Sequence, residues 1–149
     1  MDLKIKYGLI AGIGTVAVFL LFYFSEPAWM LSPILWWGSL VIYIWAMVKA
    51  SREAAKKEVK LGLREGFGVF AIANAIFYVF YYFQFTTFAP ELADIQQEMI
   101  NNSSIFTEEQ RAVMSPDLTI KGTFLRYCYN LIGGFVIAFG LSSILSRLD

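Results

Sequence analysis

Residues 49–65, KASREAAKKEVKLGLRE, form a charged segment between two long apolar halves of the chain. The segment carries three acidic residues and six basic ones, which are Lys49, Arg52, Lys56, Lys57, Lys60 and Arg64. Because the sequence on both sides is too apolar to remain in water, we expect this segment to lie at a membrane surface and to orient the chain. Its mixed charges suit it to docking or headgroup contacts, but not to a strong polybasic lipid switch.

The composition of the 149 residues is typical of a membrane protein. Hydrophobic residues make up 58% and charged residues 16%, against about 25% charged in soluble domains. There is no histidine, which excludes histidine-ligated haem, histidine zinc sites and histidine bases. The single cysteine, Cys128, excludes an internal disulfide. With no nucleotide loop or catalytic constellation either, we expect no enzyme, no cofactor, no metal site and no nucleic-acid partner.

Four apolar runs are long enough to cross a bilayer as helices. A helix rises 1.5 Å per residue, so about 20 apolar residues cross about 30 Å of hydrocarbon. The runs cover residues 7–24, 29–48, 66–88 and 122–145. Unbroken runs of this length indicate helices rather than barrel strands. The sequence therefore predicts one all-α membrane domain over residues 1–149, a four-helix bundle with a cytoplasmic loop at 49–65 and an outer loop at 89–121.

The distribution of lysine and arginine predicts the orientation of this bundle. Nine basic residues outside the apolar runs fall on the side of the charged segment, and two fall on the other. The nine are Lys4, Lys6, Arg147 and the six of the charged segment, and the two are Arg111 and Lys121. Cytoplasmic loops collect lysine and arginine. Both termini are therefore predicted to face the cytoplasm.

Residues 89–121 are expected to form a short helical cap on the outer face. Apolar residues recur at helical spacing after Pro90, a favourable first-turn residue. These residues are Leu92, Ile95 and Met99. Thr107 and Gln110 have the spacing of a capping box that opens a second short helix, and residues 115–117 are expected to end it. A flexible loop is the alternative.

Proline and aromatic residues suggest finer features of the apolar runs. Pro33, about one turn inside the second run, indicates a helix start rather than a kink. Trp36 and Trp37 lie deep enough that we expect both to pack inside the bundle. The eight aromatic side chains between Phe77 and Phe88 are interpreted mainly as an interfacial belt, with a groove for lipid chains as the alternative.

Three polar residues inside the apolar runs are candidates for lipid or partner contacts. Arg126 lies about 6 Å below the outer boundary, within reach of snorkelling or of a salt bridge to Glu91 or Asp94. A contact with substrate or lipid phosphate is the alternative. Asn74 and Asn130 lie deeper, at levels about 6 Å apart on antiparallel helices. We expect them to hydrogen-bond, directly or through water, across the interface of the third and fourth helices, with a solute path as the alternative.

Small residues mark candidate helix-packing faces. Gly8 and Gly12 have GxxxG spacing, and Gly133 and Gly134 leave one part of the fourth apolar run without side chains. Such positions let helix backbones approach closely, without naming the partner.

Several stretches together resemble a known family. They are KYGLIAG at residues 6–12, Ile-Tyr at 42–43, KLGLREGF at 60–67, and 133–146 followed by Arg147. In these positions the chain resembles a family of bacterial four-span membrane proteins known as domain-of-unknown-function family 4199. The resemblance implies a bacterial inner membrane and a weak association with polyprenol-linked glycan chemistry. It implies no established activity, so no catalytic residue is carried over.

These features lead to an expectation about function. We expect a non-enzymatic accessory or scaffold subunit that associates with a larger membrane complex or a membrane-bound glycan-handling enzyme. Its partners would be membrane lipids and other membrane protein subunits, in a bacterial inner membrane. A small oligomeric transporter or lipid translocator, using Arg126, Asn74 and Asn130, is the alternative. A membrane enzyme built from Arg126 and outer carboxylates is a third reading.

Overall fold

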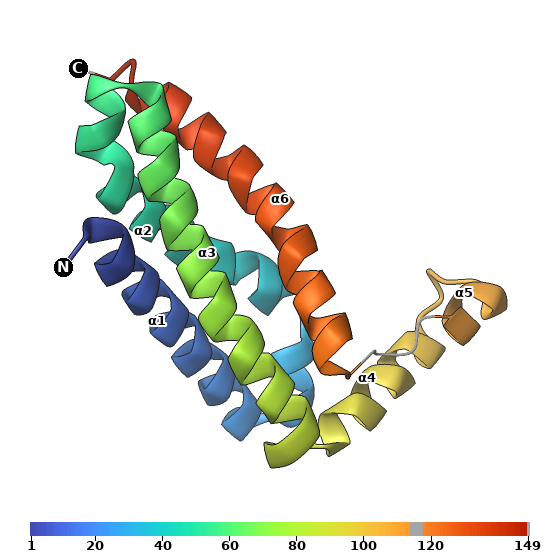
Figure 1. Cartoon of the computed structure of the whole chain (residues 1–149). Coiled ribbons are helices and arrows are strands. Elements are labelled where there is room, and N and C mark those ends of the chain that lie inside the picture. The colour runs from blue at the N-terminus through green and yellow to red at the C-terminus, as the bar shows by residue number, and fades with distance from the viewer. Residues whose placement is uncertain (114–117, 149) are drawn as a thin grey trace.

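Four long helices dominate the computed structural model, which describes residues 1–113 and 118–148 (Figure 1). They are α1 (Leu3–Ser25), α2 (Pro33–Lys57), α3 (Val59–Phe83) and α6 (Ile120–Leu145). A short π-helical turn, η2 (Gln84–Phe88), continues α3. All four, with η2 counted in α3, are long and apolar enough to cross a membrane. The expected all-α bundle of four membrane helices is confirmed.

Helix α3 is the centre of the bundle. It packs against α1, α2 and α6, and Figure 1 shows it between α1 and α6. In an apolar stretch of 18 residues in α3 and η2, 44% of the residues are buried, whereas only 22% are buried in the corresponding stretch of α6. Helix α6 is therefore peripheral, and most of its surface is left for lipid or for another protein.

The charged segment is mostly helical rather than an open loop. Helix α2 continues to Lys57 and α3 begins at Val59, so only Glu58, in an extended conformation, interrupts the helices. Alanine, lysine and glutamate are good helix formers, and Lys56 and Lys57 complement the dipole at the end of α2. The change in hydropathy at residue 49 thus marks a change of polarity and not the end of a helix.

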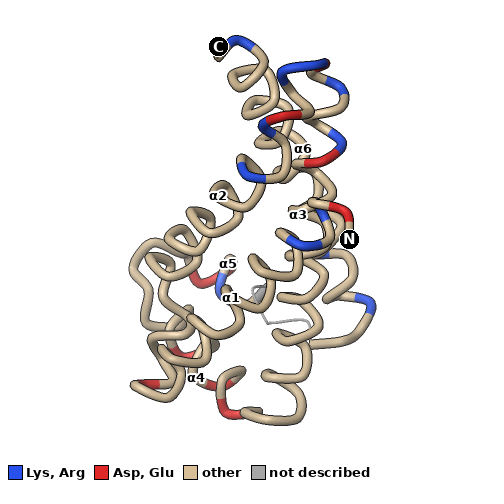
Figure 2. Tube along the Cα trace, turned by 90° about the vertical axis from the view of Figure 1, so that its left-hand side faces the viewer, with Lys and Arg blue, Asp and Glu red and all other residues tan. Residues whose placement is uncertain are grey.

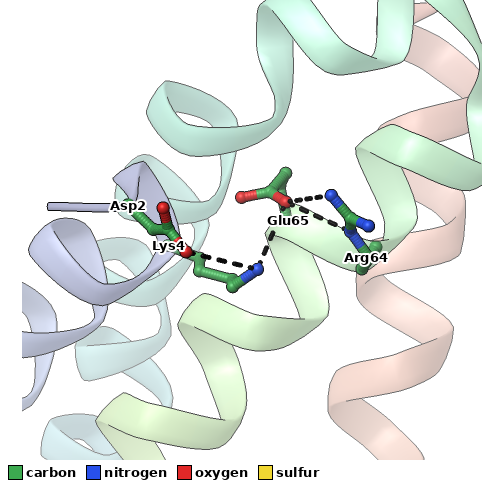
Figure 3. Close-up of polar contacts among 4 residues, drawn as sticks. All are labelled: Asp2, Lys4, Arg64 and Glu65. Carbon is green, nitrogen blue, oxygen red and sulfur yellow. Dashed lines mark hydrogen bonds and ion pairs between the residues drawn. The ribbon is translucent and has the colours of Figure 1, made fainter.

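Ion pairs join α1 to α3 at this end of the bundle (Figure 3). Lys4 Nζ lies 3.5 Å from Glu65 Oε1 and 3.9 Å from Asp2 Oδ2. Arg64 Nη2 lies 3.3 Å from the same oxygen of Glu65. Glu65 therefore connects the start of α1 to the first turns of α3.

Helix α2 starts at Pro33, as expected from the sequence. A short 3-10 helix, η1 (Pro27–Leu31), follows α1, and α2 then begins at Pro33. The missing N–H of proline costs nothing in the first turn of a helix. The expectation of a helix start at this residue is confirmed.

Two short helices project from the opposite end of the bundle (Figure 1). They are α4 (Glu91–Asn102) and α5 (Glu108–Val113), and we call residues 91–113 the acidic arm. The capping box is confirmed: Gln110 N–H donates to Thr107 Oγ1 at 3.2 Å, and Thr107 N–H donates to Gln110 Oε1 at 3.1 Å. The expected helix stop at residues 115–117 falls mainly on positions outside the described residues.

Charged residues gather at the two ends of the molecule (Figure 2). We call the end formed by residues 49–65 the basic end, and the end that carries the acidic arm the acidic end. Between them lie two apolar clusters, one around Phe19, Phe77 and Phe85, and the other around Tyr43 and Phe70. Helix α3 contributes residues to both clusters.

Candidate functional site

A cavity of about 440 Å³ lies between α2 and α6, and we call it the central cavity. Its residues come from all four long helices: Thr15, Trp36, Trp37, Ser39, Leu40, Tyr43, Phe70, Asn74, Phe77, Asn130, Gly133, Gly134 and Ile137. Trp37 on α2 is 74% exposed, and Asn130 and Gly133 on α6 are also exposed. Because these three residues belong to membrane-crossing helices, the cavity opens sideways from the bundle, toward the lipid.

Two buried polar side chains, Asn74 and Thr15, line the inner part of this cavity. Asn74 on α3 is 4% exposed and Thr15 on α1 is 1% exposed. Asn74 Nδ2 has no hydrogen-bond partner in the described part of the chain, and the Thr15 hydroxyl, which lies near that of Tyr43, makes no hydrogen bond of normal geometry there. A buried unpaired donor costs about 1–3 kcal/mol. The unpaired amide of Asn74 in the cavity wall therefore marks a site able to bind a polar group.

The expected contact between the two asparagines takes a different form. Asn130 Nδ2 donates a hydrogen bond to Tyr78 Oη on α3, rather than to Asn74. Both asparagines nevertheless line the central cavity. The polar link between α3 and α6 is therefore made by Asn130 and Tyr78, which leaves Asn74 Nδ2 unpaired in the wall of the cavity.

Arg126 belongs to a separate environment near the acidic end. Its guanidinium carbon lies 5.9 Å from the centre of the Tyr81 ring, a cation–π distance. Glu91, an expected salt-bridge partner of Arg126, accepts a hydrogen bond from Tyr23 Oη at 2.9 Å. Arg126 does not line the central cavity. The three polar residues singled out in the sequence thus do not form one site.

Many aromatic side chains of α3 and η2 pack in the core. Phe77, Tyr78, Tyr81 and Phe85 are all buried, and Tyr81 stacks on Phe85 with ring centres 4.3 Å apart. The interpretation of this cluster as mainly an interfacial belt is therefore wrong for its buried members. Hydropathy missed this because it does not show which face of α3 meets the other helices.

The two adjacent tryptophans of α2 differ in their environments. Trp36 packs edge-on against Phe19 and Phe77, at centre distances of 5.4 and 5.1 Å. Trp37 is largely exposed at the mouth of the cavity. The expectation of packing is confirmed for Trp36 and wrong for Trp37, since neighbouring residues point about 100° apart on a helix.

The candidate packing glycines fall into two groups. A Cβ atom on Gly8 or Gly12 of α1 would lie 2.8 Å from an isoleucine of α3, and one on Gly134 would overlap the Phe70 ring. These three glycines therefore lie at close helix contacts. A Cβ atom on Gly133 would meet no atom within 4 Å, and this glycine lines the cavity instead, so its expected packing role is corrected.

The six basic side chains of the charged segment are all exposed. They are Lys49, Arg52, Lys56, Lys57, Lys60 and Arg64. Lys56 pairs with Glu53 at 3.6 Å, and Arg64 pairs with Glu65, so part of the charge is balanced within the segment. This surface suits contacts with headgroups or a partner.

Metal ligands and reactive thiols give no further site. Within residues 1–113 and 118–148, no group of three or more cysteine, aspartate or glutamate side chains is placed to hold a metal ion. Cys128 is a free, half-buried thiol. The central cavity, lined by neutral side chains, is therefore the feature most suited to binding.

Comparison with known proteins places the chain in a family. No curated protein and no solved structure matches it. A family profile described as "Protein of unknown function (DUF4199)" matches residues 6–147, nearly the whole chain. The four apolar helices and this match together show that the chain is a helical membrane protein that belongs to the DUF4199 family.

Proposed function

We propose that the protein is a non-catalytic accessory or scaffold subunit of a larger membrane assembly. The acidic arm carries this proposal, because it extends beyond the bundle that anchors it (Figure 1). Helix α4 packs on η1 and η2, and Leu92 near its start is fully buried. Farther along, Met99 and Ile105 are 41% and 83% exposed. An anchored arm with apolar side chains left uncovered is suited to holding another protein.

The charge of the arm indicates the chemistry of the partner. The arm carries five carboxylates, at Glu91, Asp94, Glu98, Glu108 and Glu109, against one basic residue, Arg111. Complementary charge steers association and fixes orientation more than it adds affinity. The partner is therefore expected to present an apolar groove with a basic rim at the same membrane surface. A membrane-bound glycan-handling enzyme is one class of protein that fits this proposal.

Site-specific photocrosslinking in the native host tests the proposal. A photoreactive residue at Met99 or Ile105 should give adducts of one defined mass. The same residue at Val41 or Val136, exposed positions on the membrane helices, serves as the control. The change Glu98→Lys should reduce the arm adducts if charge guides docking. Absence of adducts from the arm, or the same adducts from the controls, would contradict the proposal.

The orientation belongs to the same proposal. We propose that the basic end and both termini face the cytoplasm of a bacterial inner membrane, as the excess of lysine and arginine suggests. In a Cys128→Ser background, a single cysteine at Ile105 should react with an impermeant maleimide on intact spheroplasts. A cysteine at Lys57 should react only after permeabilisation. The reverse pattern would contradict this orientation.

Movement of a small solute or lipid is a second candidate function, which the sideways opening of the central cavity favours. Reconstituted liposomes provide the test, with transport or lipid flipping compared between the native chain and the Asn74→Leu/Asn130→Leu variant. Native activity that the variant lacks would support this function. Equal rates in both, or no rate above protein-free liposomes, would remove its basis.

A further inference from the structure

We propose that the central cavity binds an uncharged, membrane-soluble ring compound that carries a carbonyl oxygen, with the amide of Asn74 as its hydrogen-bond donor. This site does not depend on the accessory role, because the cavity lies within the bundle and not in the acidic arm. Its volume of about 440 Å³ falls in the range of about 300–1,000 Å³ usual for small-molecule sites.

The polar atoms of the cavity define what the ligand must present. Asn74 Nδ2 can only donate a hydrogen bond, and it has no acceptor among the described residues. Thr15 lines the same cavity near the hydroxyl of Tyr43. An acceptor oxygen on the ligand would satisfy the Asn74 donor. Because a hydrogen bond in an apolar surrounding is stronger than in water, one such bond gives a clear preference for this chemistry.

Charge and depth narrow the ligand class. No lysine, arginine, aspartate or glutamate is among the residues that line the cavity, so a charged headgroup would be unpaired there. Asn74 lies eight residues past the first residue of its apolar run, Gly66, and fourteen before the end of η2, which places it about 12 Å from the basic end of the run and about 20 Å from the acidic end. The polar groups of phospholipids lie at the membrane surfaces and not at this depth. A neutral carbonyl compound that dissolves in the hydrocarbon fits both conditions.

The walls of the cavity favour a flat ring over a flexible chain. Aromatic side chains of α2 and α3 form much of the surface: Trp36, Trp37, Tyr43, Phe70 and Phe77. On α6 the wall includes Gly133 and Gly134, which present backbone instead of side chains. Rings pack well against aromatic faces and edges. A quinone is the simplest class that combines a flat apolar ring, a carbonyl acceptor and solubility in the membrane.

Tryptophan fluorescence provides the test, because Trp36 and Trp37 line the cavity. The protein carrying Trp29→Phe and Trp45→Phe, in lipid nanodiscs, is titrated with decyl-1,4-benzoquinone as quencher. We expect saturable quenching above the linear quenching caused by probe dissolved in the lipid. Asn74→Leu, which keeps the side-chain size and removes the donor, should raise the apparent Kd about fivefold, the typical effect of one lost hydrogen bond.

Two glycines of α6 give a matched pair of variants. Among the described residues, no atom lies within 4 Å of a Cβ added at Gly133 or Gly140, so a Cβ atom fits at both positions without a backbone shift. Only Gly133 lines the cavity. Gly133→Leu should abolish saturable quenching, whereas Gly140→Leu should leave it unchanged. Asn74→Leu keeps the proposal testable if Gly133→Leu does not fold.

Competition with unlabelled compounds tests the ligand class. Decylbenzene, which has the same tail and ring without a carbonyl, should compete at least about fivefold more weakly than the quinone. Equal competition by decylbenzene or by geranylgeraniol would overturn the assignment to a ring carbonyl. Quenching that is linear only would mean that the cavity holds water or lipid chains, and would overturn the site. Saturable quenching unaffected by Asn74→Leu and Gly133→Leu would place the probe elsewhere, such as the groove beside Val79, and would also overturn it.

Discussion

Replacing Gly12 by alanine tests the close contact between α1 and α3. A Cβ atom at this position would lie 2.8 Å from Ile76 Cδ1, 2.9 Å from Ile76 Cβ and 3.2 Å from Ala73 Cα. Ordinary contact begins at 3.4 Å, so the helices must separate by about 0.5 Å to relieve the contact with Ile76 Cβ. The Cδ1 atom of Ile76 can rotate away, but its Cβ and the backbone of Ala73 cannot. Gly12→Ala therefore forces the helix backbones to move.

The magnitude follows from two opposing effects. Overpacking of a well-fitted contact costs about 1–3 kcal/mol. Alanine also raises helix stability over glycine by about 0.5–1 kcal/mol. Gly14 on the same helix has no atom within 4 Å of an added Cβ, so Gly14→Ala gains the second effect without the first. We expect Gly12→Ala to be less stable than Gly14→Ala by about 1–3 kcal/mol.

Reversible unfolding of the two variants by SDS in mixed micelles, followed by circular dichroism, measures this difference. The native chain provides the reference for both. If Gly12→Ala and Gly14→Ala unfold with equal free energies, α1 does not pack on α3 through Gly12, and the arrangement derived for these helices is refuted.

Three further substitutions have defined outcomes. Ser142→Ala removes a hydrogen bond donated to a backbone carbonyl of α3 and should lower the unfolding free energy by about 0.5–1.5 kcal/mol, with Ser143→Ala as the control in the same SDS titration. Glu65→Gln breaks the ion pair between α1 and α3 and should lower the unfolding free energy by under about 1 kcal/mol, and by less at high salt. The control, Glu53→Gln on an exposed helix face, should lower it by less still. Chemical denaturation at two salt concentrations measures both effects. Thr15→Val removes a buried hydroxyl that makes no hydrogen bond of normal geometry among the described residues, and it should raise the thermal midpoint of ligand-free protein in detergent. A fall of the midpoint would show that the hydroxyl is paired, with Tyr43 as the nearest candidate.

Hydropathy predicts the four helices because each apolar run must satisfy its backbone hydrogen bonds within the membrane. It does not predict how each helix is rotated about its axis. Most differences between the expected and the observed site come from these rotations. Gly133 and Gly134 are neighbours, yet only Gly134 meets Phe70, because successive residues point about 100° apart. The sequence did single out Asn74 as a deep polar residue. Thr15 carries no such signal, since threonine in a membrane helix usually bonds to its own backbone.

The charged segment is linked to the central cavity through Gly62. This glycine lies in the second half of the segment, where an added Cβ would overlap Ala55 of α2 and Ser142 of α6. Helices α2, α3 and α6 are therefore in close contact at the basic end. Farther along, the aromatic side chains of Tyr43 and Phe70 lie between α2 and α6 and line the cavity. Small residues bring these helices together at the basic end. Larger side chains at mid-depth hold α2 and α6 apart, and the bundle opens to lipid there.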